Sequence, residues 1–219
     1  MWAGAKPLFL SGNINLDPLI DAKTDTRRGL TLIFRPPEAI IWKVQEFLHE
    51  AAIPEPHQYY YPATDIHLTV LSIISCYPDF QPDPEAVAAY QSIIDDCIRE
   101  TPLFSLQFRG VTASSAAVVI QGFNEDGQLN QLRDRLRQRF KNSGLVHTID
   151  QRYPLQTAHL TVMRFREQLY QPKVFTHFIE SNRNMEFGAC KVEELVLVYN
   201  DWYMREEEVK VLNWFGLTP

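Results

Sequence analysis

The sequence lacks the features that mark secreted, disulfide-bonded and membrane-spanning proteins. Its three cysteines, Cys76, Cys97 and Cys190, are odd in number and widely spaced, which fits neither a disulfide framework nor a zinc knuckle and favours reduced thiols. No run approaches the ~18 apolar residues of a spanning helix. The run Leu8-Phe9-Leu10 is too short for the apolar core of a signal peptide. We therefore expect a cytoplasmic protein without a membrane partner.

The sequence also lacks an excess of positive charge and a glycine-rich phosphate loop. Its net charge is -6, whereas proteins that hold duplex DNA through many phosphates usually present a basic face. The negative net charge does not exclude a small phosphorylated ligand or the end of an RNA strand, because a locally basic cleft can bind either. The apolar fraction of 45% and the charged fraction of 22% are those of an ordinary globular protein.

What is present is a pattern of strands and helices that runs twice along the chain. Residues 1–28 are polar and irregular and are expected to form an N-terminal arm, and residues 29–219 a single two-lobed domain. Strands are predicted over residues 29–35, 66–74, 103–109, 116–122, 158–165, 192–199 and 208–215, and helices over 37–52, 83–102, 127–144 and from 172. This order predicts an α+β fold. We expect two pseudo-symmetric lobes, each a small, mostly antiparallel sheet with helices outside, facing one another across a central cleft.

One tetrapeptide occurs at matching points of the two halves. It reads His67-Leu68-Thr69-Val70 in the first half and His159-Leu160-Thr161-Val162 in the second, both times in a strand-forming segment. Side chains alternate between the two faces of a strand, so each His shares a face with its Thr while Leu and Val face the core. If a twofold axis relates the lobes, the two His-Thr faces meet across the cleft.

Two imidazoles that face one phosphate are suited to acid–base chemistry. A neutral His can deprotonate an attacking water or hydroxyl, and a protonated His can donate to the leaving oxygen. The hydroxyls of Thr69 and Thr161 can hydrogen-bond the non-bridging phosphate oxygens. This chemistry needs no metal and no cofactor, and because the two motifs are identical they do not show which His is the base.

The paired motifs, about 90 residues apart in a duplicated α+β chain, resemble the 2H phosphoesterase superfamily. Within it they are similar to the branch of 2′,5′-RNA ligases and 2′,3′-cyclic phosphodiesterases of RNA ends. The resemblance implies a metal-independent hydrolase acting on a cyclic phosphate or a 2′–5′ linkage of a nucleotide or RNA end. It also implies that His67 and His159 act as acid and base, and that Thr69 and Thr161 hold the phosphate. We expect a monomer.

Four further residues are weaker candidates for substrate binding. Arg35 ends the first strand, Tyr61 precedes the first motif and either stacks on a base or packs its loop, and Tyr203 lies in the last hairpin. Arg164 follows the second motif, but alternation places it on the face opposite His159 unless the strand bulges. The basic residues of helix 127–144 are interpreted as a solvated face.

Two alternative functions remain. A protein of the same fold that binds nucleotides or RNA without catalysis would carry the same pattern. A zinc hydrolase that draws on the loop residues His57 and His147 is disfavoured, because no set of His, Cys and carboxylate ligands is local in the sequence.

Overall fold

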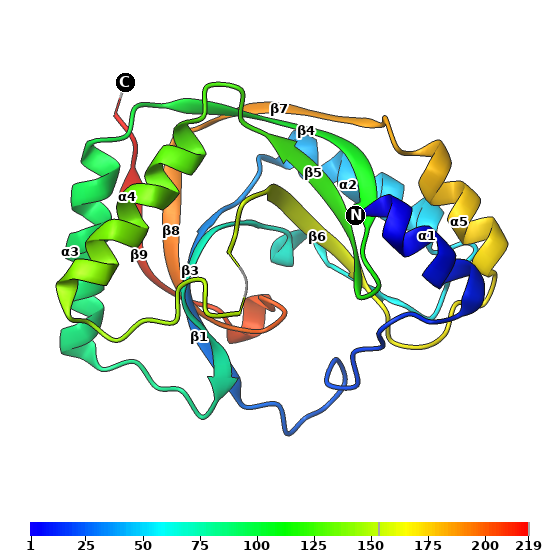
Figure 1. Cartoon of the computed structure of the whole chain (residues 1–219), viewed down its shortest axis with the longest axis horizontal. Helices are drawn as coiled ribbons and strands as arrows, with labels where there is room; N and C mark the ends of the chain where they lie inside the picture. Colours follow the sequence, from blue (N-terminus) through cyan, green and yellow to red (C-terminus); the bar gives the residue numbers. More distant parts are fainter. Residues whose placement is uncertain (153, 219) are drawn as a thin grey trace.

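A computed structural model describes residues 1–152 and 154–218 and shows a nine-stranded sheet that curls around a central space (Figure 1). The strands follow the order β7-β4-β5-β6-β3-β1-β8-β9, and the short β2 pairs with β6. Neighbouring strands run antiparallel throughout. The strands are β1 (Arg27–Phe34), β2 (Tyr59–Tyr60), β3 (Leu68–Pro78), β4 (Phe104–Ala113), β5 (Ala117–Phe123), β6 (Ala158–Arg164), β7 (Glu186–Val192), β8 (Glu194–Asp201) and β9 (Lys210–Gly216). The helices are α1 (Trp2–Ser11), α2 (Glu38–Ala51), α3 (Pro84–Arg99), α4 (Gln128–Ser143) and α5 (Pro172–Ser181), with 3₁₀ turns at Ala63–Asp65 and Glu206–Glu208.

The α+β class and the pseudo-symmetry are confirmed, but the two halves form one continuous sheet. The strands β3-β1-β8-β9 lie on one side of its centre and β6-β5-β4-β7 on the other. The motif strands β3 and β6 are neighbours at this centre, where Leu68 pairs with Leu160. The pseudo-twofold axis therefore passes between the two motifs.

The helices are exchanged between the two halves of the sheet. Although α2 follows β1 in the chain, it packs on the other half, where the Phe47 ring lies 5.3 Å from Phe178 of α5 and 5.9 Å from Phe187 of β7. Helix α4 follows β5 but packs beside α3, with Tyr90 and Phe140 5.9 Å apart. Figure 1 shows the two groups, α3 with α4 and α1 with α2 and α5, at opposite ends of the sheet.

The expectation of an irregular N-terminal arm is wrong for residues 2–11. They form α1, whose Trp2 and Phe9 side chains are buried in the main core. The Phe9 ring lies 5.3 Å from Phe165 and 5.9 Å from Phe175. The sequence obscured this helix because its apolar residues show little helical periodicity, and it contains Pro7.

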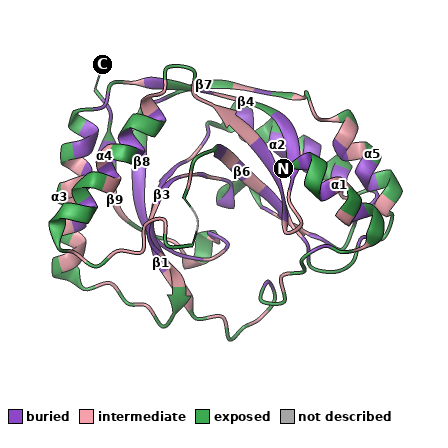
Figure 2. Ribbon diagram, viewed as in Figure 1, coloured by how far each residue is buried: buried purple, intermediate pink, exposed green. Residues whose placement is uncertain are grey.

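Other element boundaries agree with the sequence where a local signal exists. Asp83 caps α3 and accepts a hydrogen bond from the Glu85 amide, and Gly144 ends α4 in the left-handed conformation. Strand β7 was missed because small residues at its centre, Gly188, Ala189 and Cys190, give no strand-like apolar alternation, and much of it is exposed, as expected for an edge strand. Figure 2 shows the contrast with the buried strand β8. Among the described helices, none has both the length and the apolar character that crossing a bilayer requires.

Candidate functional site

The four motif side chains line one cavity of about 160 Å³. The pairing of Leu68 with Leu160 places His67 across from Thr161 and Thr69 across from His159, so each His stands diagonal to the other. Diagonal neighbours on paired antiparallel strands lie about 7–8 Å apart. The sheet thus brings the two imidazoles to one small space, although 92 positions separate them in the chain.

A bulge follows the Thr in both motif strands. Between β1 and β3 the register passes from Ile33–Thr69 to Leu32–Leu71, which leaves Val70 as the extra residue. Between β5 and β6 it passes from Val119–Thr161 to Val118–Met163, which leaves Val162 as the extra residue. A bulge adds one residue to one strand and displaces the alternation that follows it. The last residue of each tetrapeptide is therefore the bulged one.

The bulge at Val162 decides the position of Arg164. The side chains of Val162 and Met163 are both buried in the core, and alternation then returns Arg164 to the cavity that His159 lines. Its Nε donates a hydrogen bond of 2.8 Å to the hydroxyl of Tyr61, which is buried at the cavity wall. Two of the weaker sequence candidates therefore lie in the site and contact each other.

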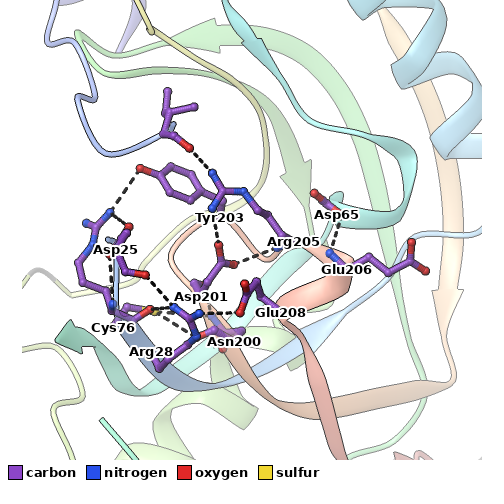
Figure 3. Close-up of polar contacts among 12 residues, drawn as sticks. Asp25, Arg28, Asp65, Cys76, Asn200, Asp201, Tyr203, Arg205, Glu206 and Glu208 are labelled. Atoms are coloured by element: carbon purple, nitrogen blue, oxygen red, sulfur yellow. Dashed lines mark hydrogen bonds and ion pairs between the residues drawn. The ribbon is translucent and has the colours of Figure 1, made fainter. Parts of the chain in front are cut away.

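The ring of His67 is held by the backbone. Its Nδ1 lies 2.7 Å from the carbonyl oxygen of Asp65, and since a carbonyl only accepts, Nδ1 carries the hydrogen. The Asp65 carboxylate accepts from the Thr64 hydroxyl at 2.9 Å. It also accepts from the Glu206 amide at 3.1 Å (Figure 3). Burial lowers the pKa of His67 to about 4, so the ring is neutral near pH 7 and its Nε2 is an acceptor.

His159 has a different partner. Its Nδ1 lies 3.3 Å from the hydroxyl oxygen of Thr157, a group that either donates or accepts. Burial lowers the pKa of His159, and the positive charge of Arg133 lowers it further. The partner of His159 thus permits both tautomers and the imidazolium, whereas the partner of His67 fixes one tautomer of the neutral ring.

Arg133 is a residue that sequence reasoning missed. The interpretation as part of a solvated face is wrong for it, because its side chain is fully buried. It donates to the carbonyls of Val70 and Thr69, both at 2.9 Å, and to that of Thr157 at 3.3 Å. These carbonyls come from the bulge of β3 and from the segment entering β6. One guanidinium therefore ties together the backbones of both motif strands.

The other two weak candidates lie beside the cavity rather than along it. Arg35 donates to the carbonyl of Thr64. Tyr203 is fully buried, and its hydroxyl donates to Asp17 at 2.9 Å and accepts from Arg27 at 3.3 Å. Figure 3 shows Tyr203 among the polar contacts of the last turn.

The cavity wall also contains residues without a sequence signal. The Arg152 guanidinium lies 4.5 Å from the centre of the Trp202 ring, and that of Arg164 lies 5.4 Å from it. Ser72 and Ser75 line the wall as well. Strict alternation from Thr69 would have put Ser72 on the opposite face, and the bulge at Val70 shifts it to the face of Thr69. Within residues 1–152 and 154–218, no group of three or more His, Cys, Asp and Glu side chains is arranged to hold a metal ion.

The lowered pKa of His67 predicts a pH dependence of stability. The unfolded chain, with a His pKa near 6.5, binds the proton more readily than the folded chain between pH 6.5 and about 4. The free energy of unfolding should therefore fall as pH falls through this window, by about 3 kcal/mol from His67 alone. Urea denaturation at pH 7 and pH 4.5 should show a smaller fall for His67→Asn than for the unchanged protein. An unchanged fall would contradict the assignment, and His177→Asn on the exposed side of α5 is the matched control.

Comparisons with known proteins agree with this geometry. The family model described as the AKAP7 2′5′ RNA ligase-like domain matches residues 36–206. Among solved structures, TT0787 of Thermus thermophilus has a TM-score of 0.65 at 17% identity, with 86% of this chain and 97% of that chain covered. LigT of E. coli complexed with 3′-AMP has a TM-score of 0.64 at 19% identity, covering 88% and 99% of the two chains, and its complex with NADP+ has 0.62 at 18%, with the same coverage. A comparison with curated proteins found no match.

Proposed function

The chain belongs to the AKAP7 2′5′ RNA ligase-like family of the 2H phosphoesterase superfamily, and we propose that it hydrolyses a phosphodiester of a nucleotide or RNA end without a metal ion. The bond is a cyclic phosphate or a 2′–5′ linkage. The observation that supports this proposal is that His67, Thr69, His159 and Thr161 line one cavity together with Arg164. The LigT structures with 3′-AMP and NADP+ support a nucleotide as the ligand class.

The side chains that line the cavity support each part of this proposed reaction. One imidazole accepts the proton of an attacking water or hydroxyl, the phosphorus–oxygen bond to the leaving group breaks, and the other imidazole donates a proton to the leaving oxygen. The Thr hydroxyls and the Arg164 guanidinium stabilise the negative charge that builds up on the non-bridging oxygens.

The test is turnover of 2′,3′-cyclic nucleotides by the purified protein in excess chelator. Hydrolysis at an unchanged rate after metal removal supports the proposal. Tight binding of nucleotides without turnover of any cyclic or 2′–5′ phosphodiester would instead identify a non-catalytic binder of this fold. Activity that disappears with the chelator and returns with zinc would identify a metal hydrolase.

Arg164 should contribute to substrate binding, because its guanidinium lines the cavity beside the four motif side chains. Arg164→Met is expected to raise KM by about tenfold or more, the loss of a charge-assisted contact. Tyr61→Phe removes only the hydrogen bond to Nε and should raise KM by about two- to tenfold. Steady-state kinetics separate KM from kcat, and Arg139→Met on the exposed side of α4 is the control. Equal KM values for Arg164→Met and the control would place Arg164 outside substrate contact.

A further inference from the structure

The proposed reaction uses only one part of the first cavity. The four motif side chains lie at the centre of the sheet, and the cavity wall continues from there along β3, where Ser72 and Ser75 line it. Ser72 lies three positions beyond Thr69, at most about 10 Å along the strand, and Ser75 lies three positions further. Arg152 and the ring of Trp202 line the cavity as well. Ser72, Ser75, Arg152 and Trp202 form the outer part of the cavity, which has no role in the acid–base chemistry.

Three guanidinium groups gather around the Trp202 ring. Those of Arg152, Arg27 and Arg164 lie 4.5, 5.2 and 5.4 Å from its centre. A cation near the face of an indole is attracted to it by about 0.5–1 kcal/mol at an exposed position. Like charges so close to one ring also repel one another unless anions offset them. The balance of charge around Trp202 therefore depends on which of the three have an acid beside them.

Only one of the three guanidinium groups has a carboxylate partner. Arg27 donates to both oxygens of Asp25, at 2.8 and 2.7 Å. The charge of Asp17 acts on Arg164 from a distance, without an ion pair. Within residues 1–152 and 154–218, Arg152 forms no ion pair at all. The outer part of the cavity thus carries an uncompensated positive charge at Arg152.

The segment that contains Arg152 is anchored on both sides. Before it, the hydroxyl of Thr148 accepts a hydrogen bond of 2.6 Å from the Ser75 amide of β3. The Arg137 guanidinium of α4 holds the Asp150 carboxylate through contacts of 2.6 and 3.3 Å. Asp150 is the one Asp or Glu among the described residues that line the cavity, so this acid is already neutralised by Arg137. The anchored segment presents Arg152, which is exposed, where a ligand entering the cavity can reach it.

We propose that the outer part of the cavity binds a second phosphate of the substrate, a phosphomonoester, with Arg152 as its charged partner. The inference rests on the proposed function and narrows its substrate class to a nucleotide that carries a terminal phosphate besides the bond that is hydrolysed. A guanidinium offers a planar set of donors that matches phosphate oxygens, and the hydroxyls of Ser72 and Ser75 can donate to the same group. In a 2′,3′-cyclic nucleotide, a phosphate on the 5′ oxygen lies at the opposite end of the ribose. One bound molecule can therefore contact both the motif side chains and Arg152.

The experiment compares 2′,3′-cyclic AMP with the same nucleotide carrying a 5′-phosphate, both in excess chelator. The unchanged protein should hydrolyse the 5′-phosphorylated compound with a kcat/KM about tenfold or more higher, mainly through a lower KM, which is the gain from one charge-assisted contact. Arg152→Met should lower this ratio of kcat/KM values by about tenfold, and Arg152→Lys, which keeps the charge, should retain part of it. Arg139→Met, on the exposed side of α4, is the matched control and should keep the ratio of the unchanged protein.

The outcomes separate this inference from the proposed function. Equal kcat/KM values for the two compounds in the unchanged protein overturn the second phosphate site and leave the phosphoesterase intact. A preference for the 5′-phosphate that survives in Arg152→Met overturns the assignment of Arg152 in the same way. If Arg152→Met lowers turnover of both compounds by the same factor, Arg152 acts on the scissile phosphate and the inference is wrong. If the unchanged protein turns over neither compound, the proposed function itself fails, and the inference fails with it.

Discussion

Replacing either His67 or His159 by Gln should lower kcat for a 2′,3′-cyclic nucleotide by about 10²–10⁴-fold, the contribution of positioned proton transfer. Glutamine keeps a polar side chain of similar reach but cannot exchange a proton near neutral pH. Because the rings line one cavity, each variant loses one of two proton transfers to the same phosphate. Initial rates at saturating substrate give the effect directly.

The double variant sharpens this prediction. Groups that act as a unit in one step are strongly non-additive, so His67→Gln combined with His159→Gln should cost little more than the worse single change. His177→Gln on α5 is the control and should keep full activity. Retention of more than about a tenth of kcat in either single variant would contradict a shared acid–base role.

The second large effect is expected at Arg133, and it concerns stability. Arg133→Met leaves a similar volume but removes the donors that pair with the buried carbonyls of Thr69, Val70 and Thr157. Removing one partner from a buried network that contains a charge typically costs about 3–5 kcal/mol. Urea denaturation should show this loss in the free energy of unfolding.

Comparison variants identify the cause of the Arg133 effect. Arg139→Met, which removes an exposed ion pair with Glu100, should cost less than about 1 kcal/mol. Arg133→Lys keeps the charge but loses the planar set of donors, so its loss in the free energy of unfolding should lie between those of Arg133→Met and Arg139→Met. A loss at Arg133→Met as small as that at Arg139→Met would mean that the bulge carbonyls do not depend on this guanidinium.

The sequence predicted those parts of the protein that local rules control. Asp83 as a cap, Gly144 as a helix end and the shared face of His67 and Thr69 follow from residues within a few positions of each other. Alternation predicted that Arg164 would reach the face of His159 only if the strand bulged, and the register of β6 contains this bulge.

What the sequence did not predict depends on partners far away in the chain. Arg133 looks like one more basic residue of an amphipathic helix, because two of the carbonyls that it binds lie more than 60 positions before it and a third lies 24 positions after it. Helix α1 is held by Phe165 and Phe175, which no local pattern near Phe9 reveals. The exchange of α2 and α4 between the halves likewise follows from packing and not from their own sequences.

The single sheet and the exchanged helices also constrain how this chain reaches its native state. Strands β3 and β6 come together at the Leu68–Leu160 pair, so the centre forms only after a large loop has closed. Contacts of such long sequence separation slow folding, and a chain made only up to β5 exposes β3 as an unpaired edge. Helices α2 and α4 each cover the half of the sheet opposite to the strand that they follow in the chain, so neither half completes its helical cover alone. We therefore expect that N-terminal and C-terminal halves of the chain aggregate when they are produced separately. During synthesis, we expect a protease-resistant species to appear only after almost the whole chain has left the ribosome.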